Sequence, residues 1–424
     1  MLRFHLLAIP LLTLALASGC SHRTPAEQAT QLADEITTLR AGLPADPTAD
    51  EAPVIAKPAK RAARAYTALQ ELQTRNPADP AVAAARTAAE PAAIEIRRIH
   101  RLATERHDLS ELMGGLKVRA YRATRTVVVP RLLDTLAAAA RQAADADFAK
   151  LPRFVREGAT VAAQLADVWP TETTAENEVP PLTRADWLRA AEQLETFNRA
   201  EPAELSLGLG IAYGALGKSS FALVELDRAT AGQFSEPEYA DIVPLVRALV
   251  YSRLGFTELA TREITRLSGD TEQGRQLLAL GHLTIAYLHS REKDWKQVDR
   301  SLGEAVRIWP NNPLVVYLSG ERLLADGSKE QALETFAKAA NSTDAAWIAP
   351  LLEKRVRSVR DSRGDAPPLF LDNGFLVEST LRLLFQEIRR KATGQKLARF
   401  LDTAQQLPAL LDLDKHAAPA VTQP

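Results

Sequence analysis

Small and apolar residues recur along this chain at the spacing of amphipathic helices, and between Ala203 and Ala340 their pattern repeats four times. Three sets of residues show the repeat, each with spacings of 38, 38 and 34 residues. The sets are Gly210, Ala248, Ala286 and Gly320; Ala222, Ala260, Val298 and Ala332; and Ala229, Leu267, Ala305 and Ala339. The pattern predicts one antiparallel helical hairpin in each unit, with longer loops in the two 38-residue units.

A turn position lies between the first and second sets. It is occupied by Gly217, Gly255 and Gly327, and by Lys293 as the exception. Glycine there supplies the positive φ that ends the first helix of a hairpin. Nine residues after each turn position stands a large apolar residue, which we expect to fill the space between one hairpin and the next. These residues are Leu226, Ile264, Leu302 and Phe336.

This order of small, aromatic, Gly, Ala, large apolar, Ala and Pro positions resembles the tetratricopeptide repeat (TPR). Tyr213 and Tyr251 occupy the aromatic position, His289 and Leu323 depart from it, and Pro310 matches the closing proline. The resemblance implies an all-α fold, a TPR-like α-solenoid of antiparallel hairpins with helical N-terminal and C-terminal extensions. The alternative is a bundle of amphipathic helices unrelated to that family.

The rest of the chain also reads as helix. We expect helices at Thr24–Leu43 and Ala59–Thr74, joined by a Pro-rich connection, and at Ala81–Arg125, with candidate interruptions at Pro91 and Gly114–Gly115. A basic helix is expected at Ala345–Ser362. Later helices would cap the last repeat or, alternatively, bind a partner.

Five regions follow from this reading. They are 1–19, a signal peptide; 20–58, a lipidated N-terminus with a helix and linker; 59–182, a helical region and a candidate for degenerate repeats; 183–340, the TPR-like repeats; and 341–424, a helical cap with a disordered tail.

The first twenty residues read as a targeting segment. Arg3 precedes a short apolar run, which ends in Ala17-Ser18-Gly19 before Cys20, the single cysteine of the chain. The segment resembles a bacterial lipoprotein signal, although Ala17 stands where Leu is commonest. That resemblance implies cleavage before Cys20, its lipidation, and, because Ser21 follows, an outer-membrane location facing the periplasm. An ordinary cleaved signal that leaves a free cysteine is the alternative.

Composition narrows the function classes. The formal net charge is −1, with 25% charged and 46% hydrophobic residues, which argues against a disordered protein and a generic nucleic-acid binder. Aromatic residues make up 6%. A basic stretch from Arg97 to Arg131 is either a solvated helix face or a contact for anionic lipid or an acidic partner.

Motifs for catalysis or cofactors are weak. Gly217-Lys218-Ser219 ends like a phosphate-binding loop, but such a loop needs Gly at position 212, which is Ala. His100 and His107, like His282 and His289, are seven residues apart, too far along a helix to hold one ion without other ligands. We therefore expect no enzyme, no cofactor and no metal.

The TPR register instead indicates a partner-binding groove. Its inward positions would be Leu207, Ile211, Leu245, Leu249, Leu283, Tyr287, Tyr317 and Glu321, with Arg253 and Arg291 at one further position. The hypothesis is a groove that takes a protein or peptide segment with apolar anchors and an acidic group near the two arginines. Alternatively, the terminal helices fill the groove. The expected function is a membrane-anchored adaptor in envelope assembly, secretion or peptidoglycan maintenance. Two other readings are an activator of an envelope enzyme and an enzyme with a site in 81–168.

Overall fold

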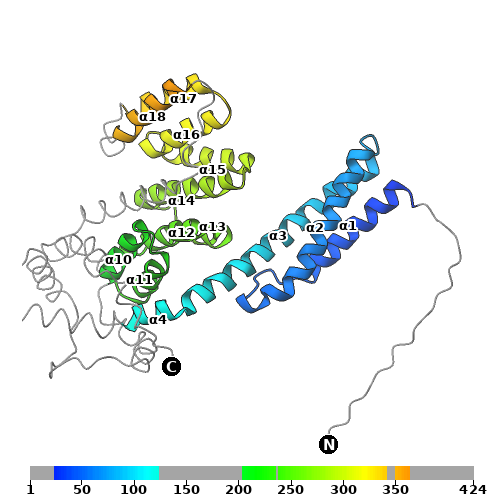
Figure 1. The fold of residues 1–424 in the computed structure, drawn as a ribbon, viewed down its shortest axis with the longest axis horizontal. Helices are drawn as coiled ribbons and strands as arrows, with labels where there is room; N and C mark the ends of the chain where they lie inside the picture. Colours follow the sequence, from blue (N-terminus) through cyan, green and yellow to red (C-terminus); the bar gives the residue numbers. More distant parts are fainter. Residues whose placement is uncertain (1–22, 124–202, 235–236, 341–348, 363–424) are drawn as a thin grey trace, which may run out of the picture. The chain divides into compact units, whose positions relative to one another are not determined.

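The computed structural model describes residues 23–123, 203–234, 237–340 and 349–362. These residues form α-helices and two short 3-10 helices, with no strand in the described ranges (Figure 1). The chain divides into two compact units, Met1–Ala103 and Thr104–Pro424. The all-α class predicted from the sequence is confirmed.

The first unit contains α1 (Pro25–Ala41), the 3-10 helix η1 (Ala49–Glu51), α2 (Ala52–Arg75) and most of α3 (Pro80–Gly114). The start of α1 agrees with the sequence because Thr24 and Glu27 form a capping box. The Glu27 amide donates to Thr24 Oγ1 at 3.3 Å, and the Thr24 amide donates to Glu27 Oε2 at 2.9 Å. Two amide groups at the helix start, which have no partner within the helix, are thereby paired.

The core of the first unit is rich in alanine. Small side chains let the axes of α1, α2 and α3 approach closely, and a few larger residues fill the remaining space. The buried cluster consists of Ala29, Ala33, Ile36, Ala59, Ala62, Ala65, Tyr66, Leu69, Val82, Ala89, Ala93 and Ile96. These positions follow helical spacing, so each helix buries a single stripe.

Two prolines behave differently from the prediction. Pro58 lies inside α2, and Pro91 lies inside α3, which does not break there. A proline removes the hydrogen bond to the carbonyl four residues earlier, here those of Val54 and Thr87. Val54 is 72% exposed and Thr87 is exposed, so water can satisfy both carbonyls. The interruption at Gly114–Gly115 is confirmed, and α4 (Leu116–Ala123) follows it.

The second unit contains four consecutive helical hairpins within the described residues. They are α10 (Ala203–Ala215) with α11 (Ser219–Ala231), α12 (Ile242–Leu254) with α13 (Thr257–Ile264), α14 (Glu272–Arg291) with α15 (Trp295–Ile308), and α16 (Pro313–Ala325) with α17 (Lys329–Ala340). Figure 1 shows them following one another, with α18 (Ala349–Asp361) beside α17. The longer loops are confirmed: residues 232–241, which include η3 (Pro237–Tyr239), and 265–271.

All four hairpins turn through a residue with left-handed backbone. Gly217, Gly255 and Gly327 have φ of 76°, 83° and 76°, and Lys293 has φ of 58°. Lys293, the exception by residue type, therefore adopts the same conformation as the three glycines. The hairpin geometry imposes this conformation whether or not the residue favours it.

Small residues on the first helix of a hairpin face large residues on the second. A Cβ atom on Gly210 would lie 2.9 Å from Leu226 Cδ2, and one on Gly320 would lie 2.5 Å from Phe336 Cε1. Leu226 and Phe336 thus fill space within their own hairpins, whereas we expected them between hairpins. Ile264 does meet the next hairpin, because a Cβ on Gly281 would lie 2.9 Å from its Cγ2.

Residues from Thr104 onward on α3, together with α4, pack on the first two hairpins. Glu105, only 5% exposed, accepts hydrogen bonds from the amides of Glu258 at 3.1 Å and Leu259 at 2.8 Å. These amides belong to the first turn of α13, where a negative charge is favoured. On α4, the Tyr121 hydroxyl donates to Glu225 of α11 at 2.8 Å, and its ring stacks on Phe221 at a centroid distance of 4.2 Å.

The last hairpin is covered by α18. Arg355 donates two hydrogen bonds to Glu321, Nε to Oε1 at 2.7 Å and Nη2 to Oε2 at 2.9 Å. Both side chains are buried, so removal of one partner would leave an uncompensated charge, at a cost of about 3–5 kcal/mol. The predicted basic helix is thus present as α18 within the described residues, and its first predicted residues, 345–348, lie outside them.

We predict that alanine has opposite effects at two exposed glycines. Gly255→Ala should lower the free energy of unfolding by about 1–2 kcal/mol, because Cβ opposes the left-handed backbone. Gly303→Ala, in the regular helix α15, should raise it by about 0.5–1 kcal/mol. An added Cβ atom would meet nothing within 4 Å at either position, so the two expected effects differ only because the backbone conformations differ. Urea denaturation measures both effects.

Lys293→Gly is the reciprocal variant of that experiment. It should raise the free energy of unfolding by up to about 1 kcal/mol, as relief of strain outweighs the added freedom of the unfolded chain. A loss of stability for Lys293→Gly, or a gain for Gly255→Ala, would show that the turns do not require this conformation.

Candidate functional site: a pocket beside the linker of the second hairpin

Eight of the ten residues expected to line a groove lie in the interior of the second unit. Leu207, Ile211, Leu245, Leu249, Leu283, Tyr287, Tyr317 and Glu321 are all buried. The reason is that α12 packs against both α10 and α14, and that Glu321 is paired with Arg355 of α18. Contact between a partner and these side chains stays a prediction, and it would require the groups that cover them to move.

The other two residues, Arg253 and Arg291, are exposed but already engaged. Arg253 Nη1 donates to the carbonyls of Gly214 at 3.0 Å and Ala215 at 3.3 Å, and Arg291 Nη1 donates to the carbonyl of Ser252 at 3.4 Å. Each guanidinium thus caps the C-terminal end of the first helix in the preceding hairpin. That end carries partial negative charge and unpaired carbonyls, so a cation there is stabilising.

Two other sequence predictions can be placed only in part. Cys20 lies outside the described residues, as do Arg125 and Arg131 of the basic stretch. Within that stretch, Arg98 hydrogen-bonds to Glu95 at 2.8 Å and lowers the pKa of that carboxyl, and Lys117 Nζ lies 5.8 Å from the centroid of the Phe221 ring. Some of these cations therefore have partners within the protein.

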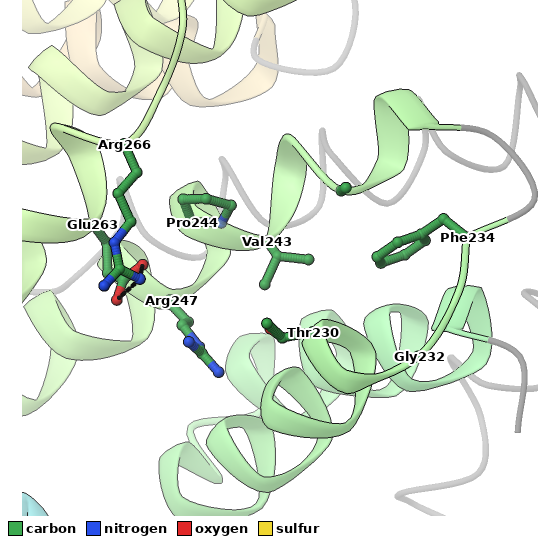
Figure 2. A pocket seen from close by; sticks show the side chains of 9 residues that line it. Thr230, Gly232, Phe234, Val243, Pro244, Arg247, Glu263 and Arg266 are labelled. Carbon is green, nitrogen blue, oxygen red and sulfur yellow. Dashed lines mark hydrogen bonds and ion pairs between the residues drawn. The ribbon is translucent and has the colours of Figure 1, made fainter. Parts of the chain in front are cut away.

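The structure shows a pocket that the sequence reading did not find. Its volume is about 210 Å³, and it lies between the end of α11, the linker after it, α12 and the end of α13 (Figure 2). Thr230, Gly232, Phe234, Ala240, Val243, Pro244, Arg247, Glu263 and Arg266 line it. In Figure 2, Phe234 lies at one end, the Glu263–Arg266 pair lies at the other, and Val243 and Pro244 lie between them.

The charged end of the pocket joins three helices. Arg247 of α12 pairs with Asp227 of α11, and Arg266 Nη1 donates to both oxygens of Glu263 at 3.0 Å. Glu263 is largely buried, whereas the Arg266 side chain is 62% exposed. Arg247 Nε is buried and donates no hydrogen bond within the described residues.

Burial has the largest effect on the pKa values of the groups at this end of the pocket. It raises the pKa of Glu263, although Arg247 and Arg266 act in the opposite direction. Burial likewise raises the pKa of the neighbouring Tyr251 hydroxyl to about 12. The cluster therefore contains a carboxyl that is easier to protonate than an ordinary glutamate and a phenol that stays neutral.

The pocket's size and lining define what it can hold. Ligand pockets for cofactors and metabolites usually measure about 300–1,000 Å³, and an apolar cavity of about 150 Å³ is enough for benzene. A space of about 210 Å³ therefore suits one apolar side chain or a small fragment. Within the described ranges, no group of three or more His, Cys, Asp or Glu side chains could hold a metal ion.

The sequence carried only an indirect signal for this site. Phe234 and Ala240 belong to the linker that lengthens the repeat to 38 residues. The sequence predicted that this linker is long but did not predict its conformation. Arg247 comes from α12, Glu263 from α13 and Arg266 from the turn after α13, so only the packing of these elements brings the three residues together. The one signal in the sequence was an aromatic residue, Phe234, in a long linker.

Comparisons of the chain with protein-family models, curated proteins and solved structures find no match. The repeat and the lipidation signal therefore rest on the residues of the chain itself. No helix in the described ranges is long and apolar enough to cross a membrane.

We predict a characteristic pH dependence for Glu263→Gln. Above about pH 4.3 the unfolded carboxyl ionises, whereas the folded one holds its proton to higher pH. The stability linked to this raised pKa is fully present at low pH and is lost as pH rises through it. The free energy of unfolding of Glu263→Gln, relative to the native chain, should therefore increase as pH rises from about 4 through the raised pKa of the folded state. Urea denaturation across that range measures the difference.

Glu304→Gln is the matched control, since Glu304 also pairs with an arginine three residues later. The hydrogen bond from Arg307 lowers the pKa of Glu304, so its linked stability is lost as pH falls. The relative stability of Glu304→Gln should thus change with pH in the opposite direction. Profiles of the same sign for the two variants would contradict the assignment for Glu263.

Proposed function

We propose that this chain is a TPR-like α-solenoid that acts as a protein-binding scaffold. The observation that carries the proposal is the left-handed turn that recurs at residues 217, 255, 293 and 327. The close contacts of Gly210 with Leu226 and of Gly320 with Phe336 also support it, because small-against-large packing in each hairpin agrees with the resemblance. Arrays of this kind offer extended surfaces to other proteins.

The pocket favours a binding role over chemistry on a metabolite. Its volume of about 210 Å³ suits one side chain, and each charged residue at one end already has an ion-pair partner, Glu263 for Arg266 and Asp227 for Arg247. An apolar anchor in a small pocket beside arginine is a common centre of protein–protein affinity. The exposed Arg253 and Arg291 lie within the same unit and provide a second surface for an acidic partner.

The proposal includes an address. The residues before Cys20 support a lipoprotein signal, and acylation of Cys20 would tether the scaffold to a membrane, most simply the outer membrane on its periplasmic side. More than one acyl chain gives stable anchoring, at about 0.8 kcal/mol per buried methylene. A tethered scaffold can hold its partner at the membrane surface and serve envelope assembly, secretion or peptidoglycan maintenance.

Site-specific crosslinking in living cells tests partner binding. A photo-crosslinking amino acid would replace Ala240 at the pocket, Leu216 beside the Arg253 edge, or Lys338 on α17, all three exposed. We expect an adduct of one discrete mass at Ala240 or Leu216, and none at Lys338. No adduct at either of the first two positions would overturn the scaffold proposal.

Cys20→Ser tests the address separately. The native chain should sediment with membranes and take up an alkyne-tagged fatty acid, whereas the variant should lose both properties. Arg23→Ser, which leaves the cysteine in place, serves as the control near the same terminus. Retention of the label by Cys20→Ser would show that the lipid is not on Cys20.

A further inference from the structure

We propose that the pocket lined by Phe234, Val243, Pro244, Arg247 and Arg266 binds one apolar side chain of a protein partner that carries an acidic residue beside it. The inference rests on the proposed scaffold function and deepens it, because it defines the chemistry of the segment that is recognised. The two ends of the pocket differ in chemistry, one being apolar and the other charged.

The apolar end can desolvate a side chain. Phe234, Val243 and Pro244 line this part of the pocket (Figure 2). Ala240 adds a small exposed residue to the lining. Val243 is buried, and Phe234 and Pro244 are partly exposed, so a guest that enters would remove apolar surface on both sides from water. A leucine-sized or phenylalanine-sized group matches the available space of about 210 Å³.

The charged end favours an acceptor over a donor. Both oxygens of Glu263 already accept from Arg266 Nη1 at 3.0 Å, which leaves that carboxylate little capacity for a cationic guest. Arg266 uses only Nη1 in these bonds, and its side chain is 62% exposed, so Nε and Nη2 remain available to a partner. Arg247 and Arg266 line the pocket together with Glu263, whereas Asp227, the partner of Arg247, is not among the lining residues, so the donors that face the pocket outnumber the acceptors.

Arg247 adds a second reason for an acidic guest. Its Nη2 pairs with Asp227, while its buried Nε donates no hydrogen bond within the described residues. A buried donor without an acceptor is unfavourable, and a small rotation toward an entering carboxylate would pair it. The guest that satisfies both ends has an apolar side chain against Phe234 and a carboxylate near the arginines.

Methyl NMR of the purified full-length chain, labelled on valine methyls, tests the proposal. The probe is N-acetyl-Leu-Asp-amide, and the controls are N-acetyl-Leu-Asn-amide, without the charge, and N-acetyl-Ser-Asp-amide, without the anchor. We expect the Val243 methyl signals to shift at millimolar probe concentration. Each control should bind about threefold to fivefold more weakly, the effect of one exposed ion pair or a small apolar contact.

Variants link the binding to the pocket. Ala240→Phe should fill the space and abolish the shift without a change in the buried core, because Ala240 is exposed. Arg266→Gln should reduce the affinity for the Leu-Asp probe to that for the Leu-Asn control. Arg307→Gln removes an equivalent exposed arginine that pairs with a glutamate three residues earlier, and it should change nothing.

Each alternative outcome has a definite meaning. Equal binding of the Leu-Asn control, or equal losses for Arg266→Gln and Arg307→Gln, would overturn the acidic requirement. Equal binding of the Ser-Asp control would overturn the apolar anchor, and no shift at Val243 would overturn the site. A partner crosslinked at Leu216 without probe binding would leave the scaffold function standing while the pocket fails. Probe binding without any crosslinked partner would do the reverse.

Discussion

The hairpins of the second unit depend on one backbone constraint, the left-handed residue between their helices. A chain that must reverse within a few residues has few backbone conformations available. The left-handed conformation is unfavourable for any residue that carries a side chain. Gly217, Gly255 and Gly327 meet the requirement without strain, and Lys293 meets it with strain that the surrounding packing must offset. Once the turn is fixed, the two helices approach at the same register, so that a small residue such as Gly210 faces a large one such as Leu226. The turn sets the register of the two helices, and this register brings Gly210 and Leu226 into close contact.

A row of hairpins has a second requirement, since each terminal hairpin has a face with no neighbouring hairpin. Within the described residues, other helices cover the first two hairpins and the last one through buried polar contacts as well as apolar ones. Glu105 on α3 caps α13, Tyr121 on α4 bonds to Glu225, and Arg355 on α18 pairs with Glu321. Such contacts require a defined geometry, because a displaced helix would leave a buried charge or hydroxyl without its partner. They therefore fix where the covering helices lie as well as stabilise them.

The sequence predicted the features that arise from local physics and missed those that arise from tertiary packing. The first helix beginning at Thr24, the glycine turns and the all-α class follow from residues close in the chain. The connection expected to reach Pro58 and the interruption expected at Pro91 were wrong, because exposed carbonyls and packing on the other helix faces tolerate the missing hydrogen bond. Periodicity placed Leu245 and Tyr287 on the inner side of their hairpins, but it could not show that other elements cover that side. Arg253 and Arg291 were predicted to face an acidic group of a partner, and their observed acceptors are backbone carbonyls.

The pocket shows how one part of a regular array can differ chemically from the other parts. The side chains between the two helices of a hairpin are needed for packing, so few of them can change to form a binding site. Linkers are less constrained, and the ten residues from 232 to 241 exceed what a link such as 309–312 needs to join two helices. Phe234 and Ala240 of the pocket lining come from this linker, whereas Val243, Pro244 and Arg247 come from α12, Glu263 from α13 and Arg266 from the turn after α13. Helix and linker residues thus both contribute to the lining, an arrangement that would suit recognition of one partner over another. Specificity in such a scaffold is therefore expected to reside where the repeat is longest.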